Sequence, residues 1–334
     1  MFSWLQRILS YARSSQLLVA IGCMLGLAAL PIGFFTDDYT FVARLDGHLP
    51  KPPTVFGLYD FVGTDRAETS TFIRQGPFPW WTALDLKLRF WRPLSSALFA
   101  FDHAVFGHAP LGYHLHALVW YGLLLGGVAS LFRRVMSVPL RRFCLLVFVL
   151  SAAHSEPVGW LSSRHLLIAA VPSLWGLVAH VAYRERGFRA GRWLAPLGLL
   201  VGLLGGEAAL GVAMFWIAYE LTGHSRTSAR GVELGHLATP VAMVLVYLIG
   251  YKVAGFGSAH NAAYFEPLSD PTSFALATAR RMPILLGEMI LGMPSALVVA
   301  LDPTPFIVLG LLATLAVAAL VVDVCKELGP TGFL

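Results

Sequence analysis

The sequence predicts an all-α, polytopic membrane protein with about eight or nine transmembrane or membrane-embedded helices and a long first outer loop that carries amphipathic helices. Two observations support this class. Of the 334 residues, 57% are hydrophobic and 13% are charged. In a typical soluble domain about a quarter of all residues are charged. Several apolar runs are long enough to cross the ~30 Å hydrocarbon core of a bilayer. No polar stretch between them is long enough for a soluble domain, so residues 1–334 are expected to form a single membrane domain.

The first predicted span covers residues 16–35, which contain no charge. Residues 36–110 follow as an outer loop that is rich in proline and aromatic residues. Within this loop, Asp85 to Phe106 has polar and apolar residues at helical spacing, which predicts an amphipathic helix on the membrane surface.

Residues 111–254 are expected to form a helical core that contains two short hairpins. The apolar runs in this core are Leu111–Phe132, Phe143–Ala153, Leu166–Tyr183, Trp193–Thr222 and Leu237–Val253. A second outer loop is expected over residues 255–283. Residues 284–322 would form the terminal helices, as the runs Ile284–Leu301 and Phe306–Val322.

The distribution of arginine predicts the orientation, because cytoplasmic segments carry an excess of Lys and Arg. The groups at Arg7/Arg13, 133–142, 184–192 and Arg226/Arg230 can all face inward only if residues 193–222 form a hairpin with Glu207 at its tip. The first outer loop, residues 154–164, Glu207 and the second outer loop then face outward. This rule also accounts for the net charge of +5, so no nucleic-acid partner is needed.

Two of the apolar runs are too short to cross the bilayer. A helix over Phe143–Ala153 would rise ~16 Å, and half of the 193–222 hairpin ~22 Å. His154, Glu156 and Glu207 are therefore expected below the outer membrane surface, where a carboxylate is costly unless it faces water, a cation or a partner. Two such tips would line a cavity that opens outward.

Two groups of residues are candidates for chemistry. Asp37 and Asp38 directly follow the first span and are candidates for a general base, with Asp38 also a candidate metal ligand; the alternative is a solvated helix cap. His154, Glu156 and Arg164 could form a pocket for a phosphorylated or sugar ligand, and the alternative is a loop with a Glu–Arg ion pair. Glu207 could belong to a site or serve structure alone.

Cations and histidines on the outer side complete the set. Arg92, Lys252, Arg280 and Arg281 are candidates to cradle a lipid-linked phosphate, with an ion pair or headgroup contact as the alternative. The four histidines between residues 103 and 116 suggest a metal or haem, but they contain no HExxH motif and His114 and His116 face different sides of a helix. They are better explained as interfacial and loop residues.

The order of several strings resembles the GT-C class of membrane glycosyltransferases, and in particular the transmembrane-and-TPR O-mannosyltransferase branch. These strings are FFTDDYTFV, WRPLSSALFAFDHAVFGHAPLGYHLHALVW, AAHSEPVGWLSSRHLLIAA, LLGGEAALGVAMFWIAYE and GYKVAGFGSAHNAAYFEPLSDP. Together they extend over roughly residues 30 to 290. The resemblance implies an inverting hexosyltransferase that uses a polyprenyl-phosphate sugar as donor and an acceptor hydroxyl on the outer face.

The resemblance also implies roles for individual residues. Asp38, with Asp37, would be the catalytic acid/base, alone or with a divalent cation such as Mg²⁺ or Mn²⁺. The residues implied to line the donor pocket are Arg92, His154, Glu156, Arg164, Glu207, Arg280 and Arg281. The implied partners are the lipid bilayer, an isoprenoid-phosphate lipid and a separate protein that presents the acceptor. The implied location is a bacterial inner membrane, with several passes and the active site facing outward.

The sequence departs from the pattern of this class at Gly205 and Gly206, where a Ser-Lys pair usually precedes the glutamate. This departure leaves two other functions open. One is a catalytically degenerate GT-C-like scaffold subunit of a membrane complex. The other is a lipid or sugar transporter, for which broken helices and intramembrane carboxylates are also expected. A redox haem protein is a more distant alternative.

Overall fold

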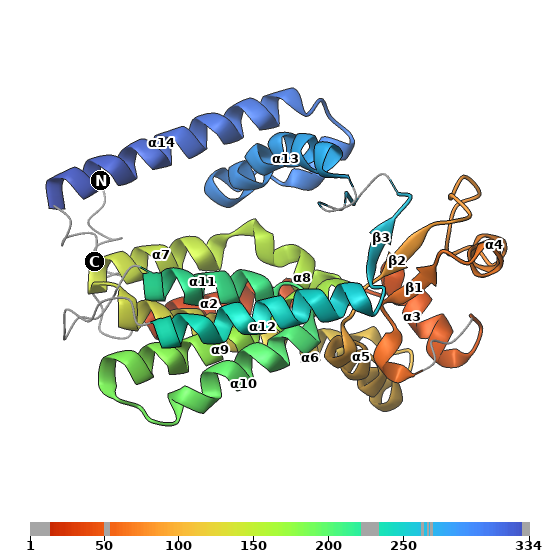
Figure 1. Ribbon diagram of the computed structural model, residues 1–334, viewed down its shortest axis with the longest axis horizontal. Coiled ribbons are helices and arrows are strands. Elements are labelled where there is room, and N and C mark those ends of the chain that lie inside the picture. The colour runs from red at the N-terminus through yellow and green to blue at the C-terminus, as the bar shows by residue number, and fades with distance from the viewer. Residues whose placement is uncertain are drawn as a thin grey trace. The chain divides into compact units, whose positions relative to one another are not determined.

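The computed structural model describes residues 14–49, 54–221, 234–261, 264, 265, 267 and 270–328. The described chain is mostly helical, which confirms the expected class in its coarse form. It divides into two compact units (Figure 1). Unit 1 comprises Met1–Leu150 and Ser155–His260, and unit 2 comprises Ser151–His154 and Asn261–Leu334. The sequence had predicted one domain.

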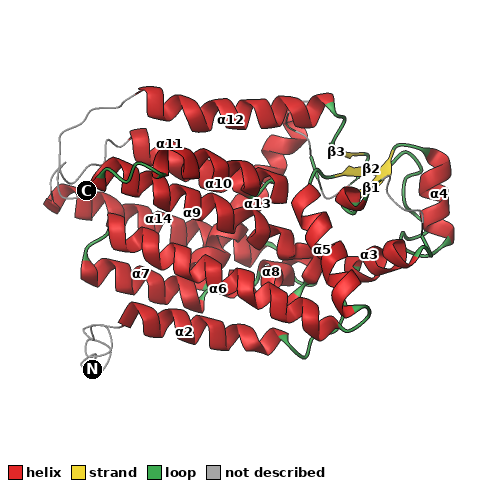
Figure 2. Ribbon diagram, turned by 90° about the horizontal axis from the view of Figure 1, so that it is seen from below, coloured by secondary structure: helices red, strands yellow, loops and turns green. Residues whose placement is uncertain are grey.

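The helices of unit 1 lie side by side, and the long connecting segment between α2 and α5 lies at one end of them (Figure 2). Its α-helices are α2 (Ser14–Gly26), α3 (Asp37–Asp46), α4 (Arg66–Arg74), α5 (Pro93–Phe106), α6 (Pro110–Val135), α7 (Val138–Leu150), α8 (Ser155–Gly159), α9 (His165–Arg186), α10 (Gly191–Gly205), α11 (Ala209–Leu221) and α12 (Leu234–Val253). Short 3-10 helices are η1 (Leu27–Ala29), η2 (Val55–Gly57) and η4 (Leu161–Arg164).

Three helices in the described chain are long and apolar enough to cross a membrane: Pro110–Val135, Leu161–Arg186 and Gly235–Val253. A fourth span is reached if Val138–Leu150 and Ala152–Gly159, which are bent by 52°, are one broken span. Ser14–Ala29, Gly191–Gly205, Ala209–Leu221 and Thr304–Ala319 are shorter apolar helices. The bend after residue 150 agrees with the prediction that Phe143–Ala153 is too short to cross alone.

The first predicted span is shorter than expected. Its helix ends at Ala29 instead of Phe35. Pro31 lacks a backbone N–H and therefore cannot continue the helical hydrogen bonds. Residues 32–35 then run without regular structure to the start of α3, and they bring the two aspartates to the end of the helical bundle.

The predicted amphipathic helix over Asp85–Phe106 is wrong in its first half. Residues Lys87–Arg89 form strand β2, and α5 begins at Pro93, a residue that suits the first position of a helix. Strand β2 pairs antiparallel with β1 (Asp60–Gly63) and with β3 (Gly257–Ala259). This small sheet joins the two segments that were predicted to be outer loops. Such short strands carry too little periodicity to be read from the sequence.

Buried Arg44 organises the loop beside this sheet. Its guanidinium donates hydrogen bonds to the carbonyl oxygens of Leu58 (3.0 Å), Asp60 (2.9 Å) and Phe61 (2.8 Å). Burial lowers the pKa of Arg44 to about 10, against the nearby charges of Glu68 and Asp60, which raise it. One cation thus satisfies three carbonyl groups that would otherwise be costly to bury.

Residues 193–222 form two helices, α10 and α11, that are separated by a turn at residues 206–208. Gly206 has a φ of 151°, a conformation that glycine adopts readily. Helix α10 packs against α9 through glycines: a Cβ on Gly198 would lie 2.5 Å from the carbonyl oxygen of Pro172, and one on Gly202 would lie 1.8 Å from Oγ of Ser173. Small residues allow such close helix packing in membranes.

Unit 2 contains η3 (Ala152–His154), α13 (Pro271–Leu291), η5 (Ser295–Val299) and α14 (Thr304–Leu328). Two predicted boundaries are wrong here. The second outer loop was expected to reach residue 283, but α13 begins at Pro271, where Asp270 caps it by accepting a hydrogen bond from the Ser273 N–H. The run Ile284–Leu301 is divided because α13 ends at Leu291, before the left-handed Gly292. Arg7, Arg13, Arg226 and Arg230 lie outside the described residues.

Candidate functional site

The site begins at the twin aspartates in the first turn of α3. A helix N-terminus favours negative charge, because its first backbone N–H groups have no partner within the helix. Asp38 is fully buried. Its Oδ1 accepts hydrogen bonds from the backbone N–H (2.7 Å) and the hydroxyl of Ser162, and its Oδ2 accepts one from the Phe35 N–H (2.9 Å). Asp38 therefore fixes the start of α3 to η4.

Asp37 differs from its neighbour. Its side chain is half-buried, and no hydrogen bond or ion pair is found for its carboxylate within the described chain. Burial and the adjacent charge of Asp38 raise the pKa of Asp37 above its ordinary value. A carboxylate of this kind is suited to accept a proton, because it has a raised basicity and an unoccupied acceptor.

Ser162 and Tyr59 connect the aspartates to the next layer of the site. The Ser162 carbonyl oxygen accepts a hydrogen bond from the Tyr59 hydroxyl (2.6 Å) and lies 2.9 Å from Nδ1 of His165. Burial raises the pKa of Tyr59, and the charges of Asp38 and Asp37 also act to raise it, whereas Arg92 and Arg164 lower it. The Arg92 guanidinium lies 5.0 Å from the centre of the Tyr59 ring.

Arg92 and Glu207 form the opposite side of the site. Arg92 Nε lies 2.8 Å from Oε2 of Glu207, and the Tyr251 hydroxyl donates to Oε1 of the same carboxylate (3.0 Å). The turn that presents Glu207 is held by Ser95, whose hydroxyl donates to the carbonyl oxygen of Gly205 (2.6 Å). The structure thus connects Glu207 with Arg92, and through Tyr59 and Ser162 with Asp38.

Glu156 lies next to this network, but Arg164 faces elsewhere. Glu156 Oε1 accepts a hydrogen bond from the hydroxyl of Ser163, which is adjacent to Ser162 (3.0 Å). Arg164 is 1% exposed and its guanidinium contacts Asp102 (2.5 Å) and the Tyr113 carbonyl oxygen (3.2 Å). The sequence had suggested that Arg164 lines a pocket with Glu156. In the structure the Arg164 guanidinium instead has buried protein partners away from Glu156.

His154, Arg280 and Arg281 belong to unit 2. Arg280 and Arg281 lie on α13, where they line a cavity of about 520 Å³ within that unit. The Arg281 guanidinium lies 5.4 Å from the centre of the Phe265 ring. Their membership of the donor site, and that of His154, stays a prediction.

Two further cations, Lys87 and Arg89, were not predicted from the sequence, and they lie near Lys252, which was. Lys87 and Arg89 lie on β2, and Lys252 lies at the end of α12. Burial and the charges of Lys252 and Arg89 lower the pKa of Lys87, which shows that the three charges are within electrostatic reach of one another. Arg89 is paired with Asp60 (2.8 and 2.7 Å). The strand pairing that gathers these cations had no signal in the sequence.

An apolar cavity of about 560 Å³ adjoins the polar network. Its lining includes Trp91, Leu203, Tyr247 and Phe256, and it lies between α10, α12 and the segment before α5. Trp91 directly precedes Arg92. Tyr247 lies one helical turn before Tyr251, with their ring centres 5.8 Å apart. A larger cavity of about 770 Å³ between α9 and α10 has no residue in common with the polar network.

The Asp38 carboxylate does not fit a metal centre. Both oxygens of Asp38 already accept hydrogen bonds from protein donors. The group of His, Cys, Asp and Glu side chains that is close enough to share an ion in the described chain is Asp46, His103 and His108. Asp38 therefore serves as a hydrogen-bond acceptor for the protein itself and not as a ligand of a cation.

Comparisons with protein families, curated proteins and solved structures give no match for this chain. The fold and site define its class: a mostly helical protein with several helices apolar enough to cross a membrane, and a buried polar network beside an apolar cavity.

Proposed function

We propose that this chain is a membrane glycosyltransferase of the GT-C type, which transfers a sugar from a polyprenyl-phosphate donor to an acceptor hydroxyl on the outer face of a membrane. The observation that carries the proposal is the junction between the polar network and the apolar cavity at two pairs of residues. Trp91 and Tyr247 line the cavity, while Arg92 and Tyr251 bind Glu207. A ligand with an apolar tail and a charged head group needs an apolar cavity and a polar site side by side.

The proposal includes the topology expected from the sequence. The chain would have about eight or nine membrane-embedded helices, counting the short apolar ones, and the segment that holds α3, α4 and the sheet would face outward. The bacterial inner membrane is the proposed location. An acceptor presented by a separate protein would approach from that outer side.

The cations around the sheet suit the phosphate of the donor. Lys87 and Lys252 lie within electrostatic reach of each other and of Arg89. Arg92, three residues after Arg89, contacts the rings of Tyr59 and Phe90 (5.0 and 4.5 Å to the ring centres). Charged donors in a partly desolvated site stabilise the negative charge that develops on a leaving phosphate. The isoprenoid tail would occupy the 560 Å³ cavity between α10 and α12.

In the proposed reaction the acceptor hydroxyl attacks the anomeric carbon of the sugar. The bond between that carbon and the phosphate oxygen breaks, and the phosphate leaves with the electron pair toward the cations. The acceptor proton passes to a carboxylate. The geometry favours Asp37 for this role over Asp38, because Asp38 already accepts three hydrogen bonds, whereas Asp37 is half-buried with a raised pKa.

Substitution of the proposed base tests this function. We expect Asp37→Asn to lower the release of polyprenyl phosphate from a panel of polyprenyl-phosphate sugars, with membranes as the acceptor source, on the order of 100- to 10,000-fold. Asp85→Asn is the matched control, since Asp85 is an exposed carboxylate in the same loop that pairs with His260. Wild-type rates in Asp37→Asn would exclude the mechanism.

A scaffold subunit is the second candidate, and one observation favours it. Arg92 is already neutralised by Glu207 at 2.8 Å, so this cation is not free for a phosphate unless the pair opens. A degenerate protein would bind polyprenyl phosphate in the cavity and release no product. Quenching of tryptophan fluorescence by the lipid together with absent turnover of every sugar in the panel would select this function over catalysis.

A further inference from the structure

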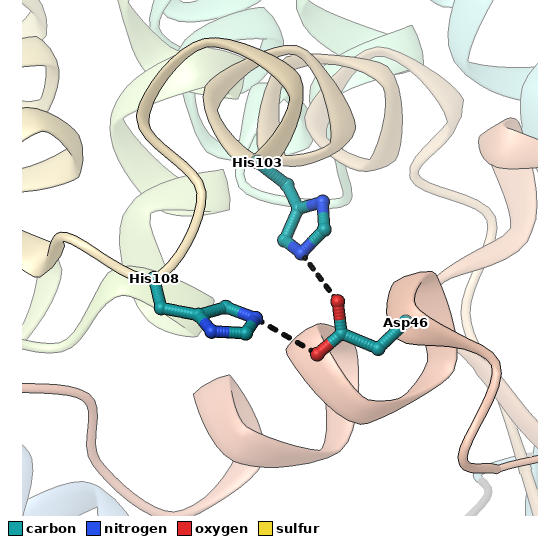
Figure 3. A group of neighbouring side chains, drawn as sticks. All are labelled: Asp46, His103 and His108. Atoms are coloured by element: carbon teal, nitrogen blue, oxygen red, sulfur yellow. Dashed lines mark hydrogen bonds and ion pairs between the residues drawn. The ribbon is translucent and has the colours of Figure 1, made fainter.

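Three side chains that the proposed reaction does not use converge at the far end of α3. Asp46 is the last residue of α3, His103 lies in the last turn of α5, and His108 follows that helix. Each imidazole directs Nε2 toward a different oxygen of the Asp46 carboxylate (Figure 3). The distances are 3.1 Å from His103 and 2.9 Å from His108.

The chain reversal at Gly107 brings the two histidines together. Residues five apart on a continuous helix face different sides, since each residue turns by about 100°. Here α5 ends at Phe106, and Gly107 has a φ of 56°, in the region that favours glycine. The Gly107 N–H bonds to the His103 carbonyl oxygen (2.9 Å), and its own carbonyl accepts from the Tyr113 hydroxyl (2.8 Å). This corner is therefore held by local hydrogen bonds.

We propose that Asp46, His103 and His108 form a binding site for a single Zn²⁺ ion. One oxygen of Asp46 and one nitrogen from each histidine all lie within 4.8 Å of one another. Two ligands of a tetrahedral zinc ion lie ~3.3 Å apart, given zinc–ligand bonds of about 2.0–2.1 Å. The two nitrogen–oxygen distances, 3.1 and 2.9 Å, are already close to this value.

The donor set and the exposure select the kind of ion and site. Two imidazoles and one carboxylate favour zinc, whereas Mg²⁺ and Ca²⁺ prefer oxygen ligands alone. The side chains of Asp46 and His103 are 21% and 20% exposed and that of His108 is 67% exposed, which leaves room for water as a fourth ligand. A bound ion would fix the end of α3 to the corner between α5 and α6.

This site is distinct from the proposed reaction centre. Asp37 and Asp46 are the first and last residues of α3, which places them ~13 Å apart along the helix. The zinc proposal therefore stands whether or not the chain transfers sugar.

Zinc retention by the purified protein tests the proposal. The protein is prepared with an affinity tag that contains no histidine, stripped with EDTA, incubated with ZnCl₂ and passed through gel filtration before metal analysis. We expect about one zinc per chain in wild type, lost in His103→Ala, His108→Ala and Asp46→Asn. His260→Ala is the matched control, because His260 is an exposed histidine that pairs with Asp85 in unit 1, and it should retain the ion.

A second measurement separates loss of binding from misfolding. Zinc should raise the midpoint of thermal unfolding of wild type and His260→Ala but not of His108→Ala, whose mostly exposed ring can be removed without disturbing the core. Equal zinc content in wild type and the His103→Ala and His108→Ala variants, or no zinc retained by wild type, would overturn the proposal. The three residues would then form hydrogen bonds alone.

Discussion

At the scale of single residues, the twin aspartates have different environments although they are adjacent. Asp38 lies inside the protein and is surrounded by donors from Ser162 and Phe35, so it holds two segments together. The Asp37 side chain is half-buried. Its pKa is raised, so it is the better proton acceptor. The sequence placed both at the site but favoured Asp38 for catalysis, because side-chain burial and hydrogen bonds to residues 124 positions away cannot be read from a local string.

The raised pKa of Asp37 predicts how activity and stability depend on pH. The unfolded carboxyl ionises at its ordinary pKa near 3.8 and the folded one at a higher pH. Raising the pH between these values therefore favours the unfolded state and lowers stability. Transfer, in contrast, should rise through the folded pKa as the base loses its proton.

Two measurements on the same variant check this prediction. At neutral pH, Asp37→Asn should unfold at a slightly higher temperature than wild type while it loses transfer; the gain is small because the carboxylate is partly solvated. Below pH 4 the two unfolding temperatures should converge. A variant less stable than wild type at neutral pH would show that Asp37 has a structural partner instead.

At the scale of elements, the contact between α9 and α10 depends on glycine. Helix α10 presents Gly198 and Gly202 to Pro172 and Ser173 of α9, at distances that leave no room for a Cβ. Close approach of this kind positions the end of α10, and with it the Gly206 turn that carries Glu207. The sequence indicated the break near Glu207 from the length of the apolar run, but the helix face that makes this contact needed the structure.

Alanine substitutions compare a crowded glycine with an open one. Gly202→Ala would place a methyl group 1.8 Å from Oγ of Ser173 and 2.5 Å from the Ala169 carbonyl oxygen. We expect it to lower stability by about 1–3 kcal/mol through overpacking. Gly211→Ala, where the same methyl group meets nothing within 4 Å, should be neutral or slightly stabilising, since alanine favours the helix. Thermal unfolding in detergent measures both, and equal effects would contradict the packing account.

The elements that sequence reasoning identified best are the long apolar helices. The predicted run Leu111–Phe132 corresponds to α6 (Pro110–Val135), and Leu237–Val253 to α12 (Leu234–Val253), because a mostly apolar run of about 17–25 residues is a strong signal. The breaks at Pro31 and Gly292 were not predicted, because the apolar composition of the sequence continues across both residues. The three strands were missed because their pairing is set by residues far apart in the chain.

At the scale of the whole molecule, unit 1 has two distinct ends. The segment with α4 and the sheet lies at one end of the helices, and the turn between α9 and α10 lies at the other (Figures 1 and 2). The arginines at 184–192 flank that turn. The positive-inside rule predicts that this turn faces the cytoplasm, and the proposed orientation therefore has the candidate site facing outward.

Cysteine labelling checks this orientation. In a chain whose three native cysteines are replaced, Gln75→Cys after α4 should react with a membrane-impermeant maleimide in intact spheroplasts. Ala190→Cys, in the turn between α9 and α10, should react only after the membrane is opened. Both positions are exposed, so accessibility in the opened membrane serves as the internal control. The reverse pattern would place the aspartates on the cytoplasmic side.

The pairing of β2 with β3 has a consequence for biogenesis. Lys87 is opposite Ala259, so the two partners are separated by most of the helical bundle in the order of synthesis. In the proposed topology, β2 reaches the outer side before β3 has been synthesised, so one edge of β2 stays unpaired until α12 has been inserted. The cationic rim of the site is therefore completed late, and a chain that stalled before α12 would expose an unpaired strand to the quality-control machinery of the cell.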